Sequence, residues 1–333
     1  MQSLTAALVQ FRFRLAKFPE IVTLISFVVL FLFFTIAADN FTSMIALSNI
    51  LSFASILGII VVGVSTLMIA GEFDLSVGST FAVASFVFAL TMNHGVPPFF
   101  AMLIALLVSA LLGAINGIIV IWSGIPSFIT TLGTMLAYRG IARTIGGGGF
   151  AKYTESKPAL FNILNGALDS FNELFDPVAN FRVSILWFLL IAGVMILVLR
   201  RTQFGNWIFA TGGNPGAALA QGVPVKRVKL MTFVMVGVFV GLASVMQFAH
   251  RTSVDPLRGE GWELIAVASC VIGGVQLTGG VGTVIGACVG ILLLQMLEQG
   301  LVLMGISVQV FRSVTGLILM LSVIINTYLT RSE

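Results

Sequence analysis

The sequence predicts an all-α polytopic membrane protein with about ten transmembrane helices. Of its 333 residues, 58% are apolar and only 9% are charged, whereas a soluble domain carries about 25% charged residues. The apolar residues gather in runs of roughly 17–25, the length that spans a bilayer as a helix. Backbone groups in lipid must be hydrogen-bonded within the segment, so runs of this kind form helices. The mean hydropathy of +1.09 also excludes a soluble globule.

The predicted spans follow one another along the whole chain. They lie at 21–38, 48–70, 76–92, 99–122, 127–145, 183–199, 229–249, 263–278, 281–298 and 310–328. Several runs are closely spaced and interrupted by polar residues, so some pairs are expected to enter the membrane as broken helices. The first run is longer than the apolar core of a signal peptide, about 7–15 residues, which favours an uncleaved helix. Residues 1–333 are therefore predicted to form a single transmembrane domain.

Basic residues near the first span set the predicted orientation. Arg12, Arg14 and Lys17 precede this span, and no basic residue lies between it and the second. Since cytoplasmic flanks carry the excess of Lys and Arg, we expect the N-terminus in the cytoplasm. An even number of spans places the C-terminus there as well, with 146–182 as a periplasmic loop and 200–228 as a cytoplasmic loop. The periplasmic loop has room for one short amphipathic helix.

Two glycine-rich strings indicate an internal repeat. The strings "IAGEFDLSVGST" (69–80) and "IGGVQLTGGVGT" (272–283) each join one apolar run to the next, with an offset of about 203 residues. Transporter folds are often built from such repeats, with the solute pathway between them. The sequence therefore predicts two related halves.

A polar segment rich in glycine separates the sixth and seventh runs: "GNWIFATGGNPGAALAQGVPVKRVK" (205–229). Asn214 is a favoured N-cap residue, Pro215 suits the first helical position, and Gly222 suits the left-handed position after a helix end. The segment therefore predicts a short capped helix. An ordinary interhelical loop is the alternative, but a loop needs no complete helix with both stops. Small residues also let another surface approach closely, which favours a docking helix.

This segment resembles the cytoplasmic signature of permease subunits in ribose-type ABC sugar importers. The matching residues are Gly205, Ala210, Gly212, Gly213, Asn214, Ala217, Ala218, Gly222 and Val223. The string "GEFDLSVGS" (71–79) is similar to a second family string, although Ala70 and Glu72 replace its usual glycines. The resemblance continues in order over nearly the whole chain, through Asn116–Gly117, "PSFITTLG" (126–133) and "AVASCVIGGVQLTGGVGTVIGA" (266–287).

The resemblance implies that the cytoplasmic segment couples this chain to a separate ATPase. The coupling residues would be Gly205, Gly212, Gly213, Asn214, Pro215, Ala217, Ala218, Gly222 and Val223. The implied assembly, in a bacterial inner membrane, joins the chain to a second permease copy as a homodimer, a cytoplasmic ABC ATPase and a periplasmic solute-binding protein. The chain contains no G-x-x-x-x-G-K-[ST] string, so ATP and magnesium would bind the partner ATPase, and no cofactor is expected in this chain.

Charge, cysteine and histidine content argue against other classes. The net charge of +4 is too small to suggest a nucleic-acid partner. Cys270 and Cys288 lie in apolar runs without a His or another Cys at metal-ligand spacing, so no metal site is expected. His94 and His250 lie near predicted loops and form no catalytic constellation, so we expect a transport subunit rather than an enzyme.

The candidate translocation pathway consists of polar and glycine positions within the apolar chain. Its residues are Asp74, Ser76, Gly78, Asn116, Gly274, Gly279 and Gly280. Irregular backbone at membrane depth is tolerated only where it is buried or lines a cavity, which places the pathway beside the two strings at the interface of two permease copies. Alternatively, Asp74 or Ser76 caps the third helix, and Asn116 joins helices. Glu72 is expected to be solvated or interfacial.

The leading hypothesis is the permease of a binding-protein-dependent ABC importer for a neutral monosaccharide or related polyol. The alternative, an ion-coupled secondary transporter of a small polar solute, would need paired ionisable groups within the membrane. Gln295, Glu298 and Gln299 share one helical face of the ninth run, but no second acid or His offers a partner there. We interpret this group as interfacial or packing residues. A pathway that releases its solute is expected to be neutral and polar.

Overall fold

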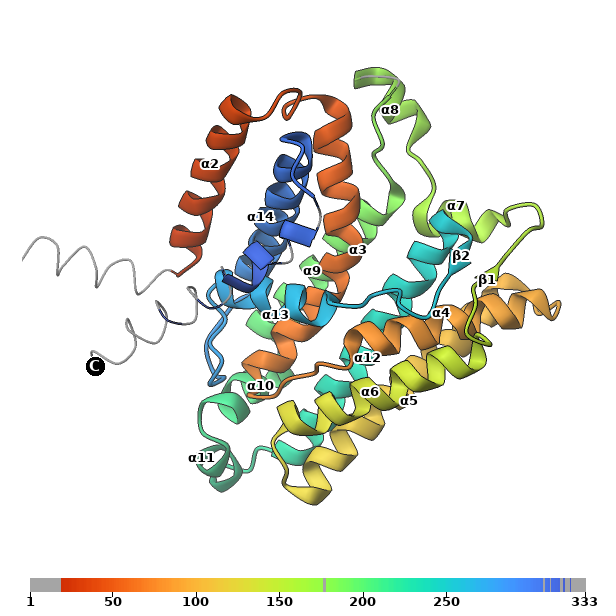
Figure 1. The fold of residues 1–333 in the computed structure, drawn as a ribbon. Helices are drawn as coiled ribbons and strands as arrows, with labels where there is room; N and C mark the ends of the chain where they lie inside the picture. Colours follow the sequence, from red (N-terminus) through yellow and green to blue (C-terminus); the bar gives the residue numbers. More distant parts are fainter. Residues whose placement is uncertain are drawn as a thin grey trace, which may run out of the picture.

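The computed structural model describes residues 19–175, 178–307, 309–311, 313–317, 320 and 324. Its helices and strands are α2 (Pro19–Ala37), α3 (Met44–Ile69), α4 (Val77–Asn93), α5 (Pro98–Ser123), α6 (Ser127–Ile145), β1 (Ala151–Lys152), α7 (Ala159–Asn165), α8 (Asp169–Phe175), α9 (Val183–Arg201), α10 (Gln203–Gly213), α11 (Pro215–Ala220), α12 (Val225–Arg251), β2 (Ser253–Val254), α13 (Trp262–Ile272) and α14 (Val284–Leu303) (Figure 1). Much of the tenth predicted run, 310–328, lies outside the described residues, as do Arg12, Arg14 and Lys17.

The described residues form a multi-pass helical membrane protein. Five of the described helices, α3, α5, α9, α12 and α14, are long and apolar enough to cross a membrane. Three shorter apolar stretches lie in α2, α4 and α13. The predicted spans before the tenth therefore correspond to helices, although not every helix has the length of a complete span.

Helix α13 is shorter than the run that predicted it. The apolar run extends to residue 278, but the helix stops at Ile272 after 11 residues. At 1.5 Å per residue it covers about 16 Å, roughly half of the hydrocarbon core. Gly274 ends the helix with a positive φ of 85°. This is the broken-helix geometry expected of a closely spaced, polar-interrupted pair.

Two other helices, α3 and α14, begin at residues that differ from the predicted starts because polar side chains cap them. Helix α3 begins at Met44 rather than at residue 48, because the Ser43 hydroxyl accepts a hydrogen bond from the Ala46 N–H at 3.3 Å. Helix α14 begins at Val284 rather than at 281, because the Thr283 hydroxyl accepts one from the Gly286 N–H at 3.1 Å. In both cases the hydroxyl satisfies an N–H group that the first turn leaves without a partner.

Helix α3 forms the centre of the bundle, and its residues from Ala54 to Ile69 are all buried. It packs against α9, α12, α13 and α14. The closest helix pair, α5 with α12, meets through glycines on both sides. A Cβ added to Gly113 would collide with the Phe233 carbonyl oxygen, and one added to Gly237 would collide with that of Ser109. Glycine lets the two backbones touch, as the spacing of Gly113 and Gly117 predicts.

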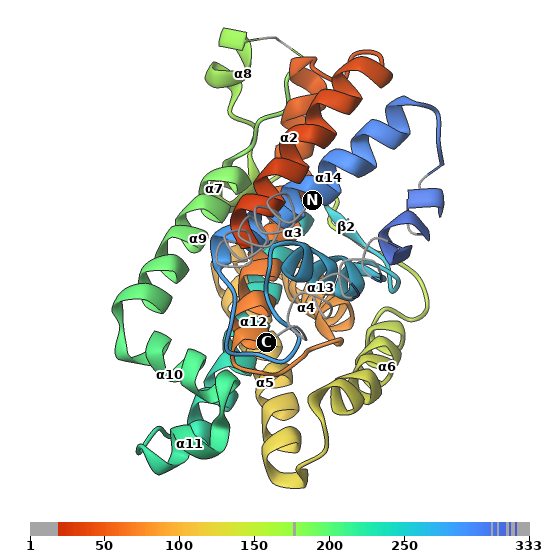
Figure 2. The ribbon, with the colours of Figure 1, turned by 90° about the vertical axis from the view of Figure 1, so that its left-hand side faces the viewer.

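The segments 146–182 and 252–261 lie at the same end of the molecule. Strands β1 and β2 pair in antiparallel register, Ala151 with Val254 and Lys152 with Ser253. Segment 146–182 contains two short helices, α7 and α8, where the sequence predicts one. Helices α8 and α11 lie at opposite ends in both views (Figures 1 and 2). Segments 146–182 and 200–228 therefore lie at opposite ends of the described structure.

Candidate functional site

The short helix predicted in the polar segment is present as α11, with both of its stops. The Asn214 side chain accepts a hydrogen bond from the Ala217 N–H at 3.0 Å, and Pro215 occupies the first turn. At the other end Gly222 has a φ of 80°, and the Val223 N–H donates to the Ala218 carbonyl at 3.0 Å. These bonds satisfy backbone N–H and C=O groups at the two helix ends that have no partner within the helix.

The two faces of α11 differ in a way that the sequence did not indicate. Ala218 and Val223 are buried against the rest of the chain. Leu219 is 65% exposed, and Asn214, Pro215 and Ala217 are exposed beside it. The outer face of α11 therefore carries one exposed apolar side chain, Leu219. Leu219 was missed because periodicity over only two turns does not separate an outer from an inner face.

A second helix, α10, precedes α11 and was not predicted. The Thr202 hydroxyl caps it by accepting a hydrogen bond from the Gly205 N–H at 3.2 Å. A Cβ on Gly205 would collide with the Val198 carbonyl oxygen in α9, so glycine allows the sharp turn from α9 into α10. Glycine-rich composition masked this helix, because glycine disfavours helix on propensity alone.

The end of α10 meets both glycine-rich strings in a junction of backbones. We call the contact of Ile69, Gly71, Gly212, Gly279 and Gly280 the glycine junction. The Gly280 N–H donates a hydrogen bond to the Ile69 carbonyl at 2.8 Å. A Cβ on Gly212 would collide with that same carbonyl oxygen and would lie 2.6 Å from the Gly280 nitrogen. A Cβ on Gly279 would lie 2.7 Å from the Gly71 Cα.

The two strings end their preceding helices with the same hydrogen-bond pattern. In the first, the N–H groups of Gly71 and Glu72 donate to Met68 and Leu67 at 2.9 and 3.1 Å. In the second, those of Gly274 and Val275 donate to Val271 and Cys270 at 3.0 and 2.9 Å. Gly71 and Gly274 both have a φ of 85°. Each is therefore a left-handed glycine closing a helix, at equivalent places in the two strings.

Three of the predicted pathway residues form one buried polar network. The Asp74 carboxylate accepts hydrogen bonds from the Ser76 N–H at 2.8 Å and from the Ser76 hydroxyl at 2.6 Å. The Asn116 amide donates to the Ser76 hydroxyl at 2.8 Å and to both Asp74 oxygens at 3.3 Å. Asp74 is 3% exposed, and Ser76 and Asn116 are 0% exposed. The network holds the first string against α5.

Helix α6 completes this arrangement with side chains that sequence reasoning did not single out. The Tyr138 hydroxyl lies 3.1 Å from the Asn116 side-chain oxygen. The hydroxyls of Ser127 and Thr131 accept hydrogen bonds from the Phe73 and Leu75 N–H groups at 2.9 and 3.1 Å. Ser127 and Thr131 lie within "PSFITTLG", which contributed to the family resemblance without a role. These hydroxyls accept hydrogen bonds from backbone N–H groups of the first string, which lies outside a helix and so has no carbonyl of its own turn to bond.

Two expectations for the first string need correction. Ser76 occupies the N-cap position of α4 but makes no side-chain capping bond, because its hydroxyl donates to Asp74 instead. Glu72, expected to be solvated or interfacial, is not solvated: it is buried and forms an ion pair with Lys229 of α12. Burial of a carboxylate is tolerated here because a cation near the start of α12 pairs with it.

The other predicted pathway residues serve close packing in this state. A Cβ on Gly78 would collide with the Gly259 carbonyl oxygen and the Glu263 carboxylate. Gly274 closes α13, and Gly279 and Gly280 belong to the glycine junction. None of the seven predicted residues lines the cavity formed by α3, α12, α13 and α14. The structure thus brings Asp74, Ser76 and Asn116 together and places the four glycines in separate contacts.

The buried network makes a prediction for stability. Replacing Asn116 with leucine, which has a similar size, should lower the free energy of unfolding by about 1–3 kcal/mol, because buried acceptors on Asp74 lose a donor. Thermal unfolding of the purified protein in detergent measures this change. Asn93→Leu is the matched control, since Asn93 is exposed and makes one bond of 3.3 Å to the Lys152 carbonyl. An equal effect of both substitutions would contradict the role of the network.

The fold is that of a multi-pass helical membrane protein, and its sequence contains no phosphate-binding loop. A family model described as the permease component of branched-chain amino acid transport systems matches residues 46–323. The autoinducer 2 import system permease protein of Salmonella typhi is 34% identical over 303 residues, 90% of this chain and 83% of that protein. The ribose import permease protein of Escherichia coli K12 is 31% identical over 322 residues, 94% of this chain and 95% of that protein. No solved structure matches the chain.

The chain therefore belongs to this family of ABC importer permeases. It is a multi-pass membrane component of a transport system and is not itself catalytic. An importer permease works with an ATPase and a solute-binding protein as partners, and the family requires no cofactor. Among the described residues, no group of three or more His, Cys, Asp or Glu side chains could hold a metal ion.

Proposed function

We propose that this permease carries a neutral monosaccharide or a related polyol or sugar-like solute across a bacterial inner membrane. Two relatives support this solute class, since one is named for ribose import and the other for autoinducer 2 import. Each alignment covers more than four fifths of this chain and of the relative, so the comparison extends over nearly the whole permease. The observation that carries the proposal is this similarity together with a capped helix on the basic, polar segment.

In the proposed topology the chain crosses the membrane ten times, with both termini in the cytoplasm and with 146–182 and 200–228 on opposite sides. The pairing of β1 with β2 supports it, because it joins two loops that this topology places in the periplasm. The equivalent helix ends at Gly71 and Gly274 support two related halves. The Lys and Arg residues around α10 and α11 favour the cytoplasm for that end.

Labelling of single cysteines tests the orientation. Ser156 and Gln203 are both exposed and lie in the two opposed segments. A cysteine at 156 should react with an impermeant thiol reagent added to intact cells, and one at 203 should react only after permeabilisation. The unchanged chain is the control, because Cys270 is buried and Cys288 is partly buried. Labelling of position 203 in intact cells would overturn the orientation.

We propose that α11 enters a groove on the ATPase and that the glycine junction passes its displacement to the two strings. Gly212 and Gly213 immediately precede the α11 cap, and Gly212 is in backbone contact with both strings. The ion pair of Glu72 with Lys229 adds a second link between the first string and the cytoplasmic segment. Rigid contacts of this kind transmit a shift because closely packed groups cannot deform independently.

The candidate pathway residues remain part of the proposal, beside the strings at the interface of two permease copies. Asp74, Ser76 and Asn116 are closed to solvent in the described state. Their exposure to solute would therefore require the strings to move relative to α5 and α6. The contact of the strings with α10 supplies a direct mechanical link for such a movement.

Reconstitution tests the proposed function. The permease would be co-expressed with an ABC ATPase and a binding protein from the same transport system, purified as a complex and placed in vesicles. Uptake of a neutral sugar should require ATP and should persist when ionophores remove ion gradients. Uptake that follows an ion gradient and ignores ATP would instead establish the ion-coupled alternative. Failure of the ATPase to co-purify would contradict the coupling role of α11.

A further inference from the structure

A cavity in the described structure lies away from the buried network. Its volume is about 470 Å³, within the range of about 300–1,000 Å³ that small-molecule pockets occupy. It is formed by α3, α12, α13, α14, the loop that precedes α13, and Phe311, Thr315 and Gly316 of the segment after α14. Gln247 lies four residues before the end of α12, so the cavity is near the end of the bundle that carries β2. This end is opposite to α11.

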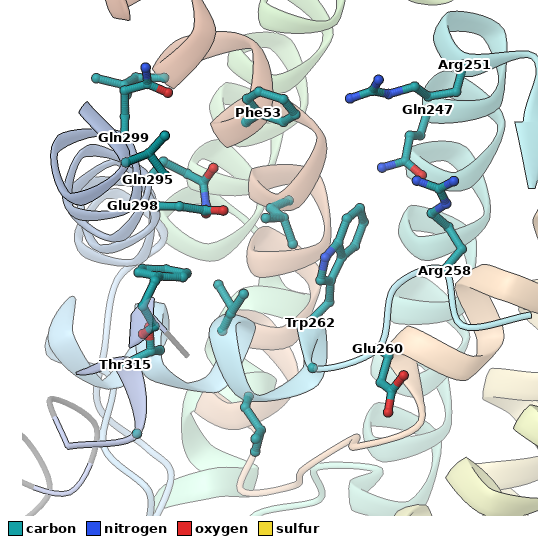
Figure 3. Close-up of a pocket in the computed structure, with 18 residues that line it drawn as sticks. Phe53, Gln247, Arg251, Arg258, Glu260, Trp262, Gln295, Glu298, Gln299 and Thr315 are labelled. Carbon is teal, nitrogen blue, oxygen red and sulfur yellow. The ribbon is translucent and has the colours of Figure 1, made fainter. Parts of the chain in front are cut away.

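Phe53, Trp262 and Phe311 contribute aromatic rings to the lining of the cavity, and three glutamines contribute amides. Trp262 stands between the α14 side chains and those of α12 (Figure 3). Its ring packs on Phe81, with centroids 4.7 Å apart, which fixes its position from behind. Gln295 and Gln299 belong to α14, and Gln247 belongs to α12. Each amide offers both donors and acceptors, the combination that hydroxyl groups of a sugar require.

The charges around the cavity balance. Arg251 and Arg258 lie on one side, and Glu260 and Glu298 also line it (Figure 3). Arg258 is already paired with Asp255 at 2.8 Å, and the Gln295 amide donates to Glu298 at 3.1 Å. An anionic solute would meet the carboxylates, and a cationic solute would meet the guanidinium groups. A lipid chain would offer no hydrogen-bond partner to the amides of Gln247 and Gln299, which is costly. A neutral polyol fits all of these groups.

We propose that this cavity receives the solute as a low-affinity site for a neutral, sugar-sized polyol, held against Trp262 and the amides of Gln247, Gln295 and Gln299. This inference rests on the proposed import function and names the residues that would meet the solute first. It also assigns Gln295 and Gln299 to solute contact, where their shared helical face had indicated packing. The site lies on the side where a periplasmic binding protein would release its cargo.

The test uses the complete complex of permease, ATPase and binding protein in vesicles, with D-ribose, D-xylose and D-galactose as probes and L-leucine as a zwitterionic comparison. Trp262→Ala should reduce ATP-driven sugar uptake at limiting sugar concentration at least about tenfold, through loss of the aromatic surface. Trp262→Phe should restore much of the rate. Gln299→Leu, which keeps the size of the side chain, should also reduce uptake. Trp122→Ala is the matched control, since Trp122 is 87% exposed on α5 and lies outside the cavity.

The outcomes separate this inference from the proposed function. If the unchanged complex imports a sugar and both Trp262→Ala and Gln299→Leu import it normally, the cavity is not the solute site, while the permease function stands. If the unchanged complex imports L-leucine and none of the sugars, the proposed solute class and the polyol site both fail. If either cavity variant lowers sugar uptake while Trp122→Ala does not, and the complexes assemble equally by size-exclusion chromatography, the site is supported.

Discussion

Replacing Gly212 with alanine should abolish ATP-driven uptake. The added methyl group would collide with the Ile69 carbonyl oxygen and would lie 2.6 Å from the Gly280 nitrogen. Both neighbours are backbone atoms, so neither can turn away as a flexible side chain would. Overpacking of this kind costs about 1–3 kcal/mol. The α10 end must then move away from the strings, which breaks the glycine junction that connects α11 to them.

Gly213 provides a matched control in the adjacent position. A Cβ there would have its nearest neighbour, the Gly280 Cα, at 4.0 Å, so Gly213→Ala should transport normally. Uptake and ATP hydrolysis would be measured for both variants in the reconstituted complex. We expect Gly212→Ala to bind the ATPase, because α11 and its cap are unchanged, but to separate hydrolysis from uptake. Normal uptake by Gly212→Ala would show that the junction does not transmit coupling.

Replacing Leu219 with aspartate should weaken the binding of the ATPase to the permease. An apolar anchor that fills a pocket of a partner commonly contributes about 2 kcal/mol or more, which corresponds to roughly thirtyfold weaker binding when it is lost. Because the side chain is 65% exposed, the change should leave the permease fold intact. Co-purification of the ATPase and stimulated hydrolysis would both fall.

One further substitution serves as a control, and another would not test docking. Gln221→Ala changes another exposed side chain at the end of α11 and should retain binding if the contact centres on Leu219. A bulky residue at Ala218 would be uninformative about docking, because Ala218 is only 5% exposed and the substitution would disturb the permease core. Equal ATPase affinity of Leu219→Asp and the unchanged chain would remove α11 as the docking element.

Local chemistry was sufficient to predict the transmembrane class and the existence of nearly every described span. Apolar run length requires helices in lipid whatever their neighbours are, and this requirement is independent of packing. The α11 helix was predictable for the same reason, since its cap and its left-handed stop are properties of Asn214, Pro215 and Gly222 themselves. The equivalence of the two strings also appeared in sequence, because left-handed glycine closes both helices.

Distant contacts decided the features that the sequence could not reveal. Whether Glu72 is solvated or forms an ion pair depends on Lys229, which follows it in the sequence by more than 150 residues. Ser76 can cap a helix or donate to Asp74, and the position of Asn116 on α5 favours the second. Glycine propensity argues against helix in α10, but packing against α9 and the strings overrides a local preference of about 1 kcal/mol. The sequence alone determined where the apolar spans lie and that α11 has a stop at each end. The tertiary structure determined which side of each helix is buried, because burial depends on the neighbours that the folded chain supplies.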